Sequence, residues 1–253
     1  MARLSPDLIS IFTPCKMVSG WEPVVTVFVR ELIRRAYSVV LPVSASINIR
    51  HLFLILFFLP AIARAEPVIL IVGDSISAGF GIPVQQGWVA LLEKQLEKDV
   101  PQVKIVNASI SGDTTVGGRN RLPALLLQHH PDLVILELGG NDALRGMPLG
   151  QIRKNLQSMV NSAQQAGAGV ILLGMQIPPN YGARYTEGFR NIYQQLGEDE
   201  DIRLVPFMLE DFVLQDGMLQ DDGIHPTEKA QPMMMQAVLN QVQPWLSQSQ
   251  WSE

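Results

Sequence analysis

The sequence predicts an α/β sandwich with one open parallel sheet, and two features of the chain carry that prediction. From Pro67 onward, five short apolar runs alternate with longer amphipathic stretches. The apolar runs are rich in β-branched residues and nearly continuous in apolarity, which is typical of parallel strands buried on both faces. Strands that alternate with helices in this way favour crossover connections within a single sheet. No linker or low-complexity segment interrupts the pattern, so we expect one domain after the N-terminal region.

Each expected element follows from its own run of residues. The expected strands are VILIVG (68–73), VKIVNA (103–108), LVILEL (133–138), VILLG (170–174) and IRLVPF (202–207). The expected helices cover 88–99, 121–130, 152–167, 185–200 and 233–246. Parallel strands all end at the same edge of a sheet, and ligands bind outside those carboxyl ends. The segments that follow the strands are therefore the first place to search for a site.

The N-terminal region carries an export signal. Residues 52–63, LFLILFFLPAIA, form an apolar block that follows Arg50 and leads into Ala-Arg-Ala at 63–65. This order is typical of a secretory signal peptide cleaved after Ala65. The block is shorter than the roughly 20 residues that a membrane-spanning helix needs, and Pro60 interrupts it. We therefore expect a periplasmic or secreted protein with no stable membrane span after cleavage, although anchoring by an uncleaved signal is an alternative.

Residues 1–65 as a whole are interpreted as an N-terminal extension followed by this signal peptide, and 66–253 as the mature domain. Signal peptides normally stand at the extreme N-terminus, whereas this apolar block begins some 50 residues into the chain. We therefore expect translation to start at a non-Met codon near Leu41 to Ile47. A ribosome-binding site just upstream of that window in the gene is the observation that would support this start.

Composition and charge exclude several classes of function. The chain has 253 residues, 47% of them apolar, which is enough for one sizeable core. The first 65 residues hold 7 of the 19 Lys and Arg and 3 of the 24 Asp and Glu, so 66–253 carry 12 basic and 21 acidic side chains. A domain this acidic has no basic stripe to neutralise phosphates, so nucleic acid is not an expected partner. The sole cysteine of the whole chain is Cys15, which lies outside 66–253. Disulfides, thiolate catalysis and cysteine zinc sites are therefore excluded from the mature domain.

Candidate catalytic residues follow three consecutive strands and stand near the end of the chain. Ser75 follows the first strand, Gly112 the second and Asn141 the third, while Asp222 and His225 lie in the run QDDGIHP. Acyl transfer requires a nucleophile, a base, a group that holds the base, and donors for the oxyanion. Each of these loops has an independent explanation as a turn. Together, however, they supply every group that acyl transfer requires.

Ser75 is the candidate nucleophile and His225 the candidate base. A serine directly after a strand can expose its hydroxyl at a helix start, although an ordinary N-cap is the simpler interpretation of Ser75 alone. His129 and His130 precede the third strand, at the amino end of the sheet and out of reach of Ser75. His225 is therefore the only plausible base in the mature domain.

Two neighbouring carboxylates are candidates for the group that holds the base. Asp222 stands three residues before His225 and could fix its tautomer, but Asp221 competes for this role, and either could instead bond the backbone of its own turn. For the oxyanion, the backbone N–H groups of Ser75 and Gly112 and the side-chain amide of Asn141 are available.

The blocks Gly73-Asp74-Ser75-Ile76, Gly112, Gly140-Asn141-Asp142 and Asp222-Gly223-Ile224-His225 resemble, in order and spacing, those of the SGNH (GDSL) hydrolases. One departure is Ile76, where the family motif has Leu. The runs NASISGDTT, RLPALL, ELGGNDALRG, PPNYGARY and QDDGIHP resemble the bacterial periplasmic branch with acyl-CoA thioesterase, protease and lysophospholipase activities. The likeness covers roughly 67–245.

This resemblance implies a three-layer α/β/α sandwich with a five-stranded parallel sheet, the flavodoxin-like SGNH fold. It implies Ser75 as nucleophile, His225 as base and Asp222 as the acid that orients the base. It also implies Ser75, Gly112 and Asn141 as oxyanion donors, with no metal or organic cofactor.

The resemblance further implies a serine hydrolase acting on aryl esters, acyl-CoA-type thioesters and lysophospholipids, with small-molecule or lipid acyl esters as partners. Residues 176–185 are rich in Pro and Gly and are interpreted either as a flap over the acyl chain or as a plain surface loop. Alternatives for the whole protein are a carbohydrate O-acetyl esterase of the same superfamily and a non-catalytic α/β binding module. A monomer is the default expectation.

Overall fold

The structure, a computed structural model, describes residues 66–100, 102–198, 201–210 and 213–248. The predicted extension and signal peptide, residues 1–65, lie outside the described residues. Five strands form the sheet: β1 (Val68–Gly73), β2 (Lys104–Asn107), β3 (Leu133–Glu137), β4 (Gly169–Leu173) and β5 (Ile202–Val205). All five predicted strands are therefore present, with ends shifted by up to two residues.

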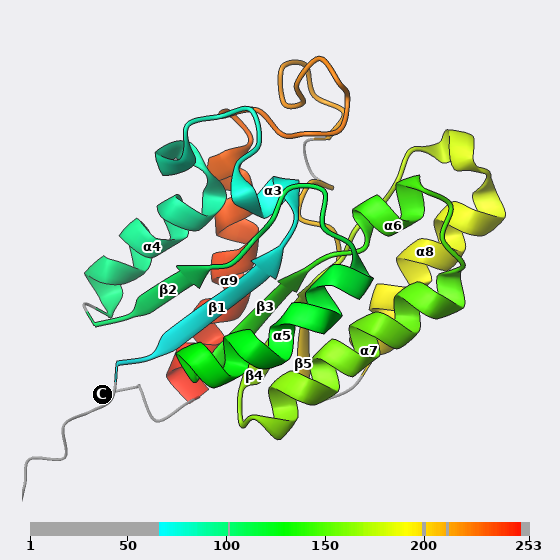
Figure 1. Cartoon of the computed structure of the whole chain (residues 1–253). Helices are drawn as coiled ribbons and strands as arrows, with labels where there is room; N and C mark the ends of the chain where they lie inside the picture. The colour runs from blue at the N-terminus through cyan, green and yellow to red at the C-terminus, as the bar shows by residue number, and fades with distance from the viewer. Residues whose placement is uncertain (1–65, 101, 199–200, 211–212, 249–253) are drawn as a thin grey trace, which may run out of the picture. The chain divides into compact units, whose positions relative to one another are not determined.

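The five strands make one parallel sheet in the order β2-β1-β3-β4-β5 (Figure 1). In register, Ile69 of β1 lies opposite Ile105 of β2 on one side and Leu133 of β3 on the other. The chain thus moves outward from β1 to β2 and then crosses back over β1 to β3. This reversal places a topological switch point at the carboxyl end of β1, where open α/β sheets bind ligands. The predicted flavodoxin-like α/β fold is confirmed.

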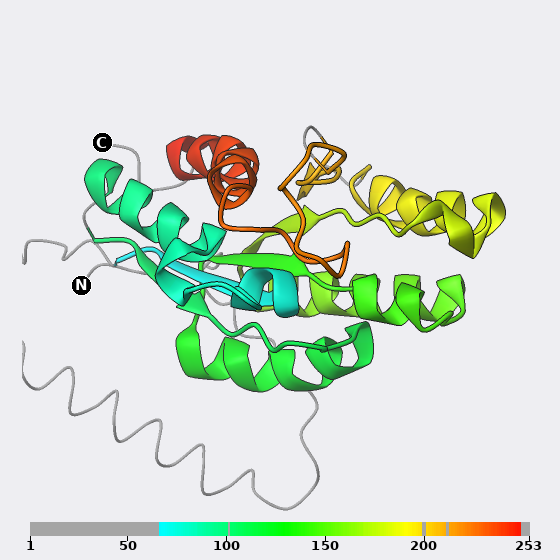
Figure 2. The ribbon, with the colours of Figure 1, turned by 90° about the horizontal axis from the view of Figure 1, so that it is seen from above.

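Helices cover both faces of the sheet. Helices α4 (Trp88–Asp99) and α9 (Gln231–Gln248) pack on one face, and α5 (Thr115–His129), α7 (Leu149–Gln165) and α8 (Ala183–Leu196) pack on the other. Figure 2 shows α4 and α9 on the opposite side of the sheet from α5 and α7. The arrangement is the predicted three-layer sandwich.

Alternation along β1 feeds two separate cores. Ile69 and Ile71 pack with α4 and α9, whereas Leu70 and Val72 pack with α5, α7 and α8. All four side chains are fully buried, as a strand covered on both faces requires. The expectation of burial on both faces was wrong for β2, which lies at the edge of the sheet and has exposed end residues.

Some helices differ from the sequence prediction. Helix α5 begins at Thr115, six residues before the predicted start, because the Thr114 side chain caps it through the Gly117 N–H. Pro123 lies inside this helix, where proline costs a backbone hydrogen bond, and packing of Leu122 and Leu126 into the core keeps the helix continuous.

Short helices were not predicted. They are α3 (Ser75–Ala78), α6 (Gly140–Leu144), and the 3₁₀ turns η2 (Val84–Gln86) and η3 (Pro179–Tyr181). Helices α3 and α6 start directly after β1 and β3, so they begin at the carboxyl edge of the sheet. Within the described ranges, no helix combines the length and apolarity that crossing a membrane requires.

Candidate active site

The nucleophile candidate stands where the sheet topology reverses. β1 ends at Gly73, and Ser75 is the first residue of α3. Asp74 caps this helix by accepting a hydrogen bond from the Ile76 N–H at 3.0 Å. The N-cap role that was an alternative for Ser75 therefore belongs to Asp74, which leaves the Ser75 hydroxyl free for another partner.

That partner is His225. Its ring Nε2 lies 2.8 Å from Ser75 Oγ, across 150 residues of sequence, and its Nδ1 lies 2.6 Å from Asp222 Oδ2. The hydroxyl, the imidazole and the carboxylate therefore form a continuous line of two hydrogen bonds. With the Nδ1 proton directed to Asp222, Nε2 is left as an acceptor for the serine proton.

Asp222, rather than Asp221, contacts the imidazole. Its Oδ1 also accepts from the backbone N–H groups of Ile224 and His225, at 2.9 and 3.0 Å. The hydrogen bond from the His225 side chain, followed by that from the His225 backbone, lowers the pKa of Asp222 to about 2. The carboxylate is therefore ionised at neutral pH. Asp221 is exposed and makes no hydrogen bond within the described part of the chain.

The three oxyanion candidates come from the ends of three neighbouring strands. The Ser75 and Gly112 backbone N–H groups make no hydrogen bond to any described residue, so both are available as donors. Gly112 has φ +79°, a conformation that favours glycine. Asn141 donates one of its two amide hydrogens to Asp74 Oδ2 at 3.0 Å and keeps the other.

A buried polar network holds the Gly112 loop against α6. Asp142 is fully buried and accepts from the Thr115 N–H and hydroxyl at 2.8 and 2.6 Å. Asn155 of α7 donates to the same hydroxyl at 2.9 Å. Arg145 donates to the Gly112 carbonyl at 3.3 Å. These bonds fix the segment after β2 relative to the segment after β3, which carry two of the three candidate donors.

Two buried carboxyl groups lie beneath the nucleophile. Glu137, the last residue of β3, is fully buried and accepts from the Asp74 N–H at 3.1 Å and from the Ser77 hydroxyl at 2.7 Å. Burial raises the pKa of Asp74 to about 6 and that of Glu137 well above its usual range, and the negative charge of Asp74 raises the latter further. Burial therefore favours the protonated form of both carboxyl groups, and it does so more strongly for Glu137.

An apolar pocket opens beside the line of hydrogen bonds. It has a volume of about 640 Å³ and is lined by Ser75, Asn141 and His225. This volume lies in the range of small-molecule sites. Gly112 is not among the lining residues. The apolar walls come mainly from Leu144, Met175, Ile177, Pro178, Phe207, Met208, Val213, Leu214, Leu219 and Ile224.

The walls come partly from a segment that the sequence analysis missed. β5 ends at Val205, so Phe207, assigned to that strand from the sequence, lies beyond it and lines the pocket with residues 208–210, 213 and 214. Residues 176–179 form another wall, and Tyr181 and Tyr185 donate hydrogen bonds to the Leu144 and Met147 carbonyls at 3.0 and 2.6 Å. The apolar residues that follow β5 in the sequence were the signal that could have identified the wall beginning at Phe207.

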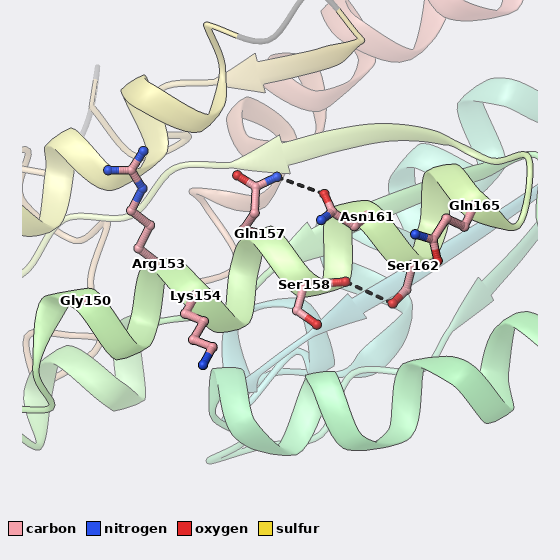
Figure 3. Close-up of a pocket in the computed structure, with 8 residues that line it drawn as sticks. All are labelled: Gly150, Arg153, Lys154, Gln157, Ser158, Asn161, Ser162 and Gln165. Carbon is pink, nitrogen blue, oxygen red and sulfur yellow. Dashed lines mark hydrogen bonds between the residues drawn. The ribbon is translucent and has the colours of Figure 1, made fainter.

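A second hollow has a similar volume, about 590 Å³, but a different lining. Figure 3 shows it along the outer face of α7, where Gln157 donates to Asn161 and Ser162 donates to the Ser158 carbonyl. Polar and charged side chains line it, and none of the predicted site residues does. Within the described part of the chain, no cluster of three or more His, Cys, Asp or Glu side chains could hold a metal ion.

Comparison with known proteins places the chain in a family. Residues 71–231 match the model of the GDSL-like lipase/acylhydrolase family. The chain is 51% identical to the esterase TesA of Pseudomonas aeruginosa over 182 residues, which are 72% of this chain and 90% of that protein. It is 43% identical over 192 residues, 76% and 91% of the two chains, to the thioesterase 1/protease 1/lysophospholipase L1 of Escherichia coli K12.

Solved structures agree with these relatives. A crystal structure of TesA matches with a TM-score of 0.68 and 51% identity, covering 70% of this chain and 98% of that one. The esterase EstA from Pseudoalteromonas sp. matches with a TM-score of 0.68 and 38% identity, covering 72% and 100%. The family resemblance and the hydrolase class inferred from the sequence are thereby confirmed: the chain belongs to the GDSL-like lipase/acylhydrolase family.

Proposed function

We propose that the protein is an exported serine esterase and thioesterase that forms an acyl-enzyme on Ser75. The observation that carries this proposal is the pair of contacts from His225, 2.8 Å to Ser75 Oγ and 2.6 Å to Asp222 Oδ2. A serine hydroxyl in contact with a properly oriented imidazole is the arrangement that acyl transfer requires.

The reaction proceeds in two halves. Ser75 Oγ attacks the carbonyl carbon of the ester or thioester while its proton moves to His225 Nε2, and Asp222 stabilises the imidazolium that forms. His225 then returns the proton to the departing alcohol or thiol, which leaves Ser75 acylated. In the second half, water gives a proton to His225 and attacks the acyl carbon. His225 then returns that proton to the Ser75 oxygen as the acyl carbon–oxygen bond breaks, which releases the carboxylic acid and restores the hydroxyl.

The Ser75 and Gly112 backbone N–H groups and the Asn141 amide stabilise the negative oxygen of both tetrahedral intermediates. Asn141 is suited to this role because Asp74 holds one of its amide hydrogens and thereby limits rotation of the group. His225 acts as the base through the unprotonated Nε2 that faces Ser75.

The pocket supports acyl chains rather than acetyl groups as substrates. Its walls are largely apolar over about 640 Å³, far more than an acetyl group fills. The curated relatives include an arylesterase of Vibrio mimicus, 44% identical over 195 residues, 77% of this chain and 98% of that protein, besides the esterase and thioesterase above. We therefore propose aryl esters, acyl thioesters and lysophospholipids as substrates. Acyl-CoA is cytoplasmic, so in an exported enzyme thioesterase activity would not be the physiological role.

The deciding experiment is an acyl-chain profile of the 66–253 protein with p-nitrophenyl esters from C2 to C16 and with acyl-CoA. We expect kcat/KM to rise from C2 toward C8, and Ser75→Ala to lower kcat about 10⁶-fold with unchanged melting temperature. A preference for C2 would favour the carbohydrate O-acetyl esterase. Equal kcat of Ser75→Ala and wild type would contradict the proposal, and no labelling of Ser75 by an organophosphonate would favour the non-catalytic module.

A further inference from the structure

The turn that carries His225 belongs to no strand or helix. It lies in the connection between β5 and α9, and its own hydrogen bonds close it. The Gln220 N–H donates to the His225 carbonyl at 2.8 Å, and Leu219 and Pro226 pair as an isolated antiparallel bridge. These bonds set the shape of the turn. They do not set the distance from His225 to Ser75, because Ser75 lies on a different segment, at the start of α3. A contact between the two segments is needed to fix that distance.

The Gln220 side chain connects the His225 turn to the segment that follows Ser75. Its amide nitrogen donates to the Phe80 carbonyl at 2.9 Å and to the Pro226 carbonyl at 3.1 Å. The Phe80 N–H in turn donates to the Ser75 carbonyl at 3.0 Å. One side chain therefore bridges the residue after His225 and a segment bonded directly to the nucleophile.

The backbone beside Phe80 is shaped for this bridge. Gly81 has φ +75°, and a Cβ atom there would lie 2.3 Å from Gln220 Oε1. A side chain at this position would displace the amide, so the close approach of the Gln220 side chain requires glycine.

A ring contact acts on the imidazole itself. The Phe80 and His225 rings lie with centroids 4.5 Å apart and planes tilted by 39°. Phe80 is 50% exposed, so much of its apolar surface is left in water, and the ring contact covers one side of the imidazole. The carbonyl of Phe80 thus holds the turn while its ring limits the tilt of the base.

We infer that Gln220, together with Phe80, is a positioning residue that holds His225 at proton-transfer distance from Ser75. This inference rests on the proposed function. Gln220 contacts backbone carbonyls and Phe80 contacts the His225 ring, so both act through the imidazole. Proton transfer depends steeply on geometry, and a displacement near 1 Å can lower a rate by about 10²-fold. Losing the Gln220 bridge should therefore slow acylation without weakening substrate binding.

The test compares Gln220→Ala and Gln220→Met with wild type, using a p-nitrophenyl ester. Met keeps the length of the side chain and removes both donated hydrogen bonds. We expect each variant to lower kcat by about 10- to 100-fold, with KM within twofold and an unchanged melting temperature. Phe80→Leu, which keeps the carbonyl and removes the ring, should lower kcat less. The matched control is Gln157→Ala, which removes a glutamine that donates to Asn161 on α7 (Figure 3) and does not line the pocket beside Ser75, so kcat should be unchanged.

A double-mutant cycle distinguishes positioning from general damage. In a His225→Ala background, adding Gln220→Ala should not lower the residual rate further, because Gln220 acts through the imidazole. Wild-type kcat in Gln220→Met, or an equal loss in the presence and absence of His225, would overturn the inference. Failure of the proposed function gives a different result, in which Ser75→Ala itself stays active.

Discussion

Replacing Asp222 by Asn should remove catalysis while leaving the turn intact. The Asn side-chain oxygen can still accept from the Ile224 and His225 backbone N–H groups, which now bond Asp222 Oδ1 at 2.9 and 3.0 Å. The amide nitrogen takes the place of Oδ2, 2.6 Å from His225 Nδ1. A donor there requires Nδ1 to be an acceptor, so the proton moves to Nε2. Nε2 then donates to Ser75 and cannot take its proton.

The expected loss is about 10⁴-fold in kcat, the cost of the corresponding exchange in a serine protease, or about 5 kcal/mol of transition-state stabilisation. Steady-state hydrolysis of a p-nitrophenyl ester at pH 8 measures it, and the melting temperature should stay within a few degrees of wild type. Asp221→Asn is the matched control, since it changes the adjacent carboxylate and should leave kcat unaltered. The tautomer argument fails if Asp222→Asn retains more than a tenth of wild-type kcat, or if Asp221→Asn is the more damaging exchange.

Three further changes test the surroundings of the site. Asn141→Ala should lower kcat by about 10²–10³-fold with little change in KM, since it removes a transition-state donor; steady-state kinetics would contradict this if KM alone rose. Glu137→Gln should match wild type in acid and become the more stable protein as pH rises above about 4.5, the ordinary pKa of Glu137, because the carboxyl then ionises in the unfolded chain before it does so in the folded one. Melting temperatures of the two proteins that stay parallel from pH 4 to 9 would refute it. Asn155→Ala should lower the free energy of unfolding by about 1–3 kcal/mol in urea titrations, because Asn155 is fully buried and bonds Thr115 and Arg119; a loss below 0.5 kcal/mol would count against the network.

The fold could be predicted because its signals are local. The five strands are short and nearly continuous in apolarity, and their alternation with helical stretches indicated a parallel sheet covered on both faces, which proved wrong for the edge strand β2. Helix α5 was predicted too short because Gly117 and Gly118 stand within its first turn and Pro123 lies inside it. These residues disfavour a helix on local grounds, and the packing of the helix against the sheet overrides them. That packing depends on residues distant in sequence.

The site could be predicted in part for the same reason. Ser75, Gly112 and Asn141 follow strands, so the topology alone brings them to one edge of the sheet. The choice of Asp222 over Asp221 depended on a family resemblance, because the orientation of a turn cannot be derived from the spacing of its residues. Glu137 was missed since it stands in an apolar strand as one polar residue, and its contact with the segment of Asp74 joins positions 63 residues apart.

The connection between β5 and α9 supplies both the proposed base and much of the proposed acyl pocket. Phe207, Met208, Val213 and Leu219 form one wall of the pocket, and His225 follows in the same segment. Substitutions in this segment that alter the preferred length of the acyl chain would also shift the imidazole of His225. Substrate range and turnover would therefore change together. The wall at residues 176–179 carries no catalytic group, and redesign of chain-length preference should therefore begin there.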